Sequence, residues 1–80
     1  MAKSHYIKTL TKYFQDVSLR KKTFELRFND RKYEVGDVLV LQDFDGEKLT
    51  GNEVSRTVTY ILDDAEKFGL MKGFVILAME

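Results

Sequence analysis

Three charged residues, Lys22, Glu25 and Arg27, lie close enough in the sequence to act together on one ligand. Glu25 and Arg27 are two residues apart in the alternating segment 23–28, so both side chains are expected on the same face of a strand. Lys22 precedes this strand, and its long stem can reach the same face. A carboxylate flanked by two cations can orient donors around an anionic or hydrogen-bonding ligand. The alternative is an ion-pair cluster at the rim of a sheet, with no ligand.

The strand that would hold this trio is predicted by a strict alternation of apolar and polar residues. In segment 23–28, Phe24, Leu26 and Phe28 alternate with Glu25 and Arg27. We therefore expect the aromatic and aliphatic residues on a buried face of the strand. The charged residues are expected on the opposite, polar face.

A short helix is predicted before this strand, because an apolar stripe of Tyr13, Phe14, Val17 and Leu19 falls roughly on one helical face and the pattern ends near Arg20. The hydroxyl of Thr9 or Thr11 is expected to cap its first turn. Further strands are predicted at residues 5–10, 38–44, 53–62 and 74–79. Five or six short strands with one early helix, joined by tight turns, favour an α+β fold. We expect a small mixed β-barrel in a single domain over residues 1–80.

The composition excludes several classes of protein. The 80 residues contain no cysteine, which excludes a disulfide scaffold, a thiolate zinc site and a catalytic thiol. They contain one histidine, which excludes an all-histidine metal cage. Thirteen basic and thirteen acidic residues give a net charge of zero, which argues against a strongly basic polyanion binder. Residues 1–32 nevertheless carry nine basic and three acidic groups. No apolar run reaches the ~18 residues of a membrane span, so we expect a cytoplasmic domain without a membrane, metal or cofactor partner.

The residues that lead from the helix into the strand resemble a known family motif. Arg20-Lys21-Lys22-Thr23-Phe24-Glu25-Leu26-Arg27 is similar to the ASCH motif G-x-K-x-x-E-x-R of the PUA-like superfamily, matched at Lys22, Glu25 and Arg27. The resemblance extends over most of the chain, through His5-x-x-Lys8, Tyr13-Phe14, Asn29-Asp30-Arg31, Val35-Gly36-Asp37, residues 58–62 and residues 73–77. One position departs from the motif, because Arg20 replaces its glycine. A left-handed helix stop is easy for glycine and strained for arginine.

The ASCH resemblance implies a PUA-like β-barrel with a helix packed beside it and a cleft lined by Lys22, Glu25 and Arg27. Three further residues would lie near the rim of that cleft: Asn29, Asp30 and Arg31. The related group occurs in bacteria and phages, and RNA binding is inferred for it by analogy. The implied partner is therefore RNA or a modified nucleoside.

Two other functions stay open. Some relatives in the superfamily are acetylcytidine amidohydrolases, which use a lysine, a strand threonine and a distant glutamate. Lys22 matches the lysine, but Glu25 occupies the place of the threonine and Thr23 is displaced by two positions. An enzyme would therefore have to use Lys22 with Glu25 or Thr23. The remaining alternative is a non-catalytic protein-interaction domain.

Residues outside the motif give weaker signals. His5 could be a general base, a group that stacks on a base, or a hydrogen-bonded strand residue, and the last is the common role of a lone histidine. Tyr33 and Phe44 are flanked by charges, so they are the aromatic residues expected to be exposed for stacking on bases. Segment 43–47 has the first acidic residues of a calcium loop and lacks the later ligands.

Overall fold

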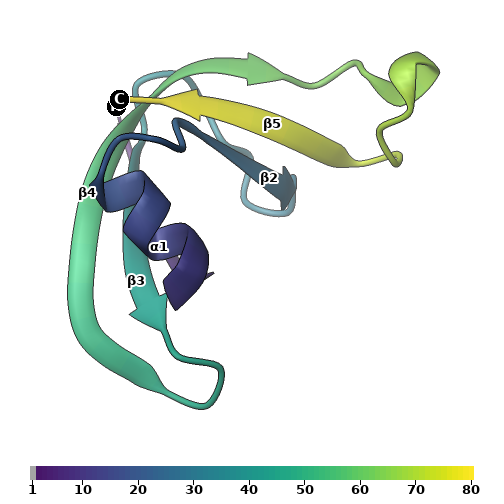
Figure 1. The fold of residues 1–80 in the computed structure, drawn as a ribbon. Helices are drawn as coiled ribbons and strands as arrows, with labels where there is room; N and C mark the ends of the chain where they lie inside the picture. The colour runs from purple at the N-terminus through teal and green to yellow at the C-terminus, as the bar shows by residue number, and fades with distance from the viewer. Residues whose placement is uncertain (1) are drawn as a thin grey trace.

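The computed structural model describes residues 2–80, and its five strands form one mixed sheet in the order β1-β3-β4-β5-β2 (Figure 1). β1 pairs with β3 in parallel, and the other neighbours are antiparallel. The elements are β1 (Ser4–Leu10), α1 (Thr11–Ser18), β2 (Phe24–Phe28), β3 (Val38–Phe44), β4 (Leu49–Leu62), a 3-10 turn η1 (Glu66–Phe68) and β5 (Phe74–Met79). Within these residues the predicted mixed α+β class, with five strands and one short helix near the N-terminus, is confirmed.

β4 is the longest strand and divides the sheet into two regions. It pairs with β3 up to Thr57 and with β5 from Val58. A register irregularity between Val58 and Tyr60 follows this change of partner. We call β1, β3 and the β4 residues paired with β3 the β1–β3 region, and we call β2, β5 and residues 58–62 the β2–β5 arm. The two regions meet at an angle, so the arm extends to one side (Figure 1).

α1 lies in the angle between the two regions and completes the core (Figure 1). Phe14 and Val17 are its buried residues. The core cluster consists of Ile7, Phe14, Val17, Tyr33, Leu39, Leu41, Val58, Val75, Leu77 and Met79. An eight-residue helix is marginal on its own, so this packing stabilises it. No helix within residues 2–80 is long and apolar enough to cross a membrane.

Both ends of α1 differ from simple capping. No side chain caps the first turn: the N-cap is Leu10, and the Thr11 hydroxyl instead donates to the Asp43 carboxylate of β3. The predicted threonine cap is therefore wrong. The helix ends at Ser18, and Arg20 then takes a left-handed φ of 62°. An arginine thus makes the left-handed stop for which the ASCH motif has glycine.

β1 and β2 are the two edges of the sheet, and within residues 2–80 no backbone hydrogen bond joins them. The sheet is not closed into a barrel, so the predicted closure is not confirmed. Side chains bridge the edges instead. Arg27 Nη2 donates to the Lys8 carbonyl at 2.9 Å, and Arg31 Nη1 donates to the Tyr6 carbonyl at 2.7 Å. At this β1–β2 seam, two arginines therefore satisfy backbone acceptors that a closing strand would otherwise pair.

β2 has the alternation that the sequence predicts, with its faces reversed. Glu25 is only 4% exposed, whereas the three apolar residues of β2 are between 49% and 53% exposed. The prediction of a buried apolar face and a solvated polar face is therefore wrong.

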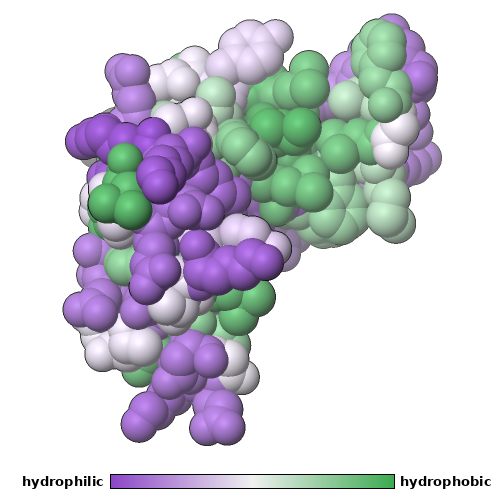
Figure 2. Space-filling model, viewed as in Figure 1, coloured by the Kyte–Doolittle hydropathy of each residue, from purple (hydrophilic) through white to green (hydrophobic). Residues whose placement is uncertain are grey.

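Cross-strand partners share one face of a sheet, so this exposed surface continues onto β5 and β4. We call it the apolar outer face: Phe24, Leu26, Phe28, Tyr60, Leu62, Phe74, Ile76 and Ala78. Figure 2 shows hydrophobic residues gathered over the arm, whereas the rest of this view is mainly hydrophilic.

Candidate functional site

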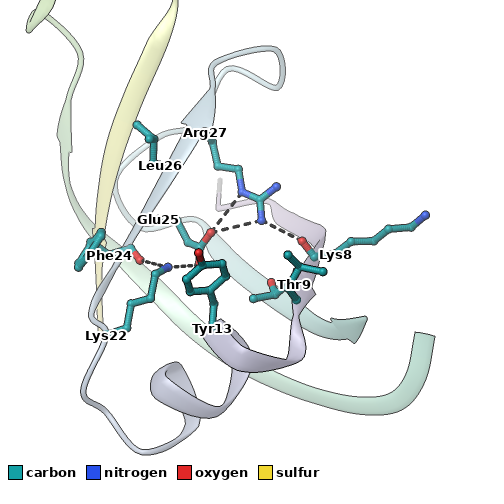
Figure 3. Close-up of a pocket in the computed structure, with 9 residues that line it drawn as sticks. Lys8, Thr9, Tyr13, Lys22, Phe24, Glu25, Leu26 and Arg27 are labelled. Atoms are coloured by element: carbon teal, nitrogen blue, oxygen red, sulfur yellow. Dashed lines mark hydrogen bonds and ion pairs between the residues drawn. The ribbon is translucent and has the colours of Figure 1, made fainter. Parts of the chain in front are cut away.

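A buried carboxylate lies at the centre of the site. Glu25 extends from β2, and its side chain is 5% exposed. Lys22 Nζ donates to Glu25 Oε1 at 2.7 Å (Figure 3). Arg27 Nε donates to Oε2 at 3.2 Å, and Arg27 Nη2 lies at the same distance from that oxygen. The structure thus brings together the three residues that their spacing singles out, and the two cations offset the cost of burying the carboxylate.

Each cation also binds a backbone carbonyl. Lys22 Nζ donates to the Phe24 carbonyl at 2.7 Å, and Arg27 Nη2 donates to the Lys8 carbonyl at 2.9 Å. Lys22 therefore holds the carboxylate to the edge of its own strand, and Arg27 holds it across the seam. The Lys22 and Arg27 side chains remain 16% and 30% exposed. A third N–H of Lys22 and the Nη1 group of Arg27 form no hydrogen bond within residues 2–80, so both can serve a ligand.

A hollow of about 400 Å³ opens at the seam beside this carboxylate. Its lining comes from β1, α1, the segment between α1 and β2, and β2 itself: Lys8, Thr9, Leu10, Tyr13, Lys22, Phe24, Glu25, Leu26 and Arg27 (Figure 3). A smaller hollow of about 360 Å³ is lined by Tyr13, Asp16, Lys21, Lys22 and Phe24. Three residues line both hollows and form their shared wall: Tyr13, Lys22 and Phe24.

The aromatic residues beside the hollows are Tyr13 and Phe24, not the two expected from the sequence. Tyr33 is 6% exposed, Phe44 is partly buried, and neither lines a hollow, so that prediction is wrong. Tyr13 and Phe24 are 41% and 49% exposed. Lys22 Nζ lies 4.9 Å from the centroid of the Phe24 ring, within the range of cation–π attraction. The predicted apolar stripe of the helix included Tyr13 and Leu19, but both are exposed, so that part of the prediction is wrong. Adjacent helical residues cannot both face the core, so burial of Phe14 turns Tyr13 outward.

Four predicted binding residues lie outside both hollows: His5, Asn29, Asp30 and Arg31. The last three form the turn after β2. The Asn29 side-chain oxygen accepts the Tyr33 N–H at 3.2 Å, and the Arg31 guanidinium binds β1 across the seam. Asp30 is exposed, and its N–H donates to the Phe28 carbonyl at 2.8 Å. These contacts fix the turn and the seam.

His5 belongs to a buried cluster at the start of the sheet. Its Nε2 lies 2.8 Å from Asp37 Oδ2, and its ring meets the Tyr33 ring edge-on with centroids 4.7 Å apart. The Asp37 carboxylate also accepts the backbone N–H groups of Lys3 and Glu34, each at 3.0 Å. Burial alone would raise the pKa of Asp37, but these hydrogen bonds outweigh burial and lower its pKa to about 2. Of the three roles considered for His5, the structure has the hydrogen-bonded strand residue.

The two threonines near the seam differ in position. Thr23 is exposed and lines neither hollow, although Lys22 and Glu25 line the larger one. The threonine that lines the larger hollow is Thr9, whose hydroxyl donates to the Ile7 carbonyl at 3.4 Å. Within residues 2–80 no group of three or more side chains could hold a metal ion. The arrangement can bind anions through its cations and hydrogen-bond donors through its carboxylate.

Two comparisons with known proteins bear on the chain. It is similar to the "Uncharacterized 12.9 kDa protein in GpA 3'region" of Escherichia phage P2, with 41% identity over 63 residues. That similarity covers 79% of the chain and 58% of the phage protein, so the chain spans little more than half of this relative. Residues 4–79, from the first residue of β1 to the last residue of β5, match the family described as "Domain of unknown function (DUF3850)". The chain therefore belongs to the DUF3850 family.

Proposed function

We propose that this chain binds single-stranded RNA and that the larger hollow at the seam takes one nucleotide of the strand. The observation that carries the proposal is the Glu25 carboxylate, held beside the hollow by Lys22 and Arg27 at 2.7 and 3.2 Å. The carboxylate would accept a hydrogen bond from a base amino group. The two cations would bind a phosphate or the edge of a base.

The size and the aromatic wall of the hollows support this ligand. A volume of about 400 Å³ lies within the range of small-ligand sites. Tyr13 and Phe24 are exposed beside it, and stacking on an aromatic ring is worth about 1–3 kcal/mol per base. The smaller hollow shares this wall, so it would take the next nucleotide. The phosphate that links the two nucleotides would then lie near the Lys22 ammonium.

The local charge also favours a polyanion. Around the larger hollow, Lys8, Lys22 and Arg27 outnumber Glu25. This positive excess is local, because the whole chain has a net charge of zero. A local excess of cations attracts phosphates and makes binding weaken as salt rises.

An ASCH-like relationship and a PUA-like barrel with an open seam are part of the same proposal. The match of Lys22, Glu25 and Arg27 to the ASCH motif supports it, as do the five strands, the helix beside them and the arginines that bridge β1 and β2. In such a barrel the seam would be the ligand entrance. RNA would there meet side chains of both edge strands.

The test is a titration of the ¹⁵N-labelled chain with single-stranded RNA of about six nucleotides and with the matching mononucleotides. We expect amide shifts at Tyr13, Lys22 and Phe24, and tighter binding of the oligonucleotide because it can occupy both hollows. With about three phosphate contacts, a tenfold rise in salt should weaken binding about 100-fold. A lack of salt-dependent shifts near the seam at millimolar RNA would contradict the proposal.

Two lysine variants form a matched pair for this titration. Lys22 lies at the wall of both hollows, whereas Lys48 is exposed in the β3–β4 hairpin and lines neither. Lys22→Gln should weaken RNA binding about tenfold, equivalent to ~1.4 kcal/mol. Lys48→Gln should leave it within about twofold. Equal weakening by both variants would mean that RNA binds by diffuse charge and not at the seam.

A further inference from the structure

The apolar outer face of the β2–β5 arm is not covered by any element within residues 2–80. Its most exposed members, Phe24, Leu26, Phe28, Tyr60 and Leu62, are between 38% and 62% exposed. The opposite face of β5 contributes three residues to the core. A sheet with one solvated face normally shows polar residues on that face. The arm instead has apolar residues on both faces of β5, which is typical of a strand layer packed on two sides.

The exposed apolar area is what a protein–protein interface requires. A large aromatic side chain buries roughly 150–250 Å², so these five residues together expose on the order of 500 Å². Two such faces packed together would bury on the order of 1,000 Å² in total, the area that a specific interface needs. Each face thus has the ~300–600 Å² of the largest patch on a typical monomer, and such patches are often functional.

We propose that a second copy of this chain covers the apolar outer face, with the two arms packed face to face about a two-fold axis. An isologous interface places the same patch on both partners, and two packed sheets lie ~10 Å apart with interdigitating side chains. No residue of the apolar outer face is charged, so no like charges meet across the axis. The net charge of zero also removes long-range repulsion between copies.

The dimer face and the proposed RNA site overlap at two residues and can be tested separately at the others. Phe24 and Leu26 belong to the outer face and also line the larger hollow. Tyr60 and Leu62 lie on β4, which β5 separates from β2, and they line neither hollow. Substitutions at Tyr60 and Leu62 therefore act on the dimer without altering the lining of the hollows.

The experiment is sedimentation equilibrium of the whole chain from about 10 μM to about 1 mM. We expect the weight-average mass to rise from 9.3 kDa toward twice that value. Tyr60→Glu should raise the dimer Kd at least about 30-fold, because it places an unpaired charge in an apolar interface. The matched control is Leu19→Glu, since Leu19 is 66% exposed and lies after α1, outside the outer face. This control should leave the Kd within about twofold.

Three results would overturn the dimer. A weight-average mass that stays at 9.3 kDa up to about 1 mM would show that no dimer forms and that a different protein covers the face. An equal rise in Kd for Tyr60→Glu and Leu19→Glu would place the contact elsewhere. The third result comes from a measurement that needs no variant, on a mixture of ¹³C-labelled and unlabelled chains. In a dimer of this kind, nuclear Overhauser effects should connect the Ile76 methyl groups of one copy to aromatic protons of its partner. A dimer without these effects uses another surface.

Discussion

The two edge strands of the sheet alternate in the same way but differ in what they turn inward: β1 buries one apolar and two polar residues, whereas β2 buries a charged residue. β1 buries His5, Ile7 and Thr9 and exposes the residues between them. β2 buries Glu25 and leaves the apolar residues on either side about half exposed. An alternating pattern therefore fixes the period of a strand, while the inward face depends on what its neighbours offer. β2 can turn a carboxylate inward because Lys22 and Arg27 lie within hydrogen-bond distance of it.

The buried carboxylates beside the two edges also differ in how exposed their partners are. Asp37, beside β1, accepts hydrogen bonds from His5 and two backbone N–H groups and is 1% exposed. Glu25 is equally well paired, but its partners Lys22 and Arg27 are partly exposed and keep unused donors at an open hollow. The first cluster has the arrangement of a structural anchor. The second has the arrangement of a binding site whose partners face solvent.

The largest expected effect comes from removing the inward carboxylate. Glu25→Ala leaves two partly buried cations without their partner, which should lower the free energy of unfolding by about 3 kcal/mol. Urea denaturation of the variant and the wild type measures this loss. The control is Glu53→Ala, because Glu53 is exposed and accepts one hydrogen bond from Gln42. That change should cost less than about 0.5 kcal/mol.

A triple variant tests the cause of the loss. Replacement of Lys22, Glu25 and Arg27 by Met, Leu and Met removes all three charges together, and buried ion pairs replaced in this way often lose little stability. We expect its unfolding free energy within about 1 kcal/mol of the wild type and no binding of RNA. If the triple variant were as unstable as Glu25→Ala, unpaired charge would not explain the single variant.

The Asp37 carboxylate beside β1 should make the stability of the fold depend on pH. Hydrogen bonds lower the pKa of Asp37 to about 2 in the folded chain against 3.8 as its ordinary value, despite burial, which acts in the opposite direction. A group whose pKa is lower in the folded state stabilises the fold above its unfolded pKa. This stabilisation, on the order of 2 kcal/mol, should be complete above about pH 4 and lost as the pH falls toward 2.

Urea midpoints measured between pH 7 and pH 2 check this expectation. Asp37→Asn keeps the shape of the side chain and removes its charge, so it should be less stable at neutral pH and show a flatter decline below pH 4. Other carboxylates titrate in both proteins and cancel in the difference. Parallel pH curves for the wild type and Asp37→Asn would contradict the assigned role of Asp37.

Most elements of the fold could be read from the sequence because local patterns determine them. The strand predicted at residues 38–44 coincides with β3, and the strand predicted at residues 74–79 coincides with β5. Whether the sheet closes could not be predicted from the sequence, because closure depends on whether β1 and β2 approach closely enough to pair. Here Arg27 and Arg31 occupy the acceptors of β1 that such pairing would use.

The candidate site was predictable only in part. The approach of Lys22, Glu25 and Arg27 follows from their short spacing in β2 and just before it, which is local. The aromatic wall was missed because Tyr13 reaches the hollow from α1, and the contact of α1 with the seam is a tertiary feature. The inward turn of Glu25 was missed for a related reason. Hydrophobic patterning favours burial of Phe24 and its neighbours, and only the tertiary structure shows that the core lies on the other side.

A smaller loss of stability is expected from substitutions at two glycines, one just before β5 in the arm and one in the hairpin of the β1–β3 region. Gly73, before β5, has a φ of 86°, and a Cβ placed on it would lie 2.5 Å from Cε1 of Phe28. Gly46, in the β3–β4 hairpin, has a φ of 104° and no atom within 4 Å of such a Cβ. Gly46→Ala therefore reports backbone strain alone and should cost about 1 kcal/mol. Gly73→Ala adds displacement of the half-exposed Phe28 ring and should cost about 2 kcal/mol in thermal or urea unfolding. Equal losses would show that the ring moves aside freely.

The smallest expected effect is a gain in stability where the chain leaves α1 for β2. Arg20 holds a left-handed φ of 62°, which costs a non-glycine residue roughly 1 kcal/mol. Burial lowers the pKa of Arg56, and the nearby Arg20 charge lowers it further, so these two cations also repel. Arg20→Gly should therefore raise the free energy of unfolding by about 0.5–1 kcal/mol.

Arg20→Ala separates the two contributions, because it removes the charge and keeps the backbone strain. We expect its stability to fall between those of the wild type and Arg20→Gly in the same urea series. A glycine variant less stable than the alanine variant would contradict the strain argument. RNA titration of both variants then tests the seam: Arg20 lines neither hollow, so a site confined to them should bind RNA equally well in both. An equal loss of affinity in both variants would instead extend the binding surface from the hollows onto the end of α1, since the two variants share only the missing guanidinium.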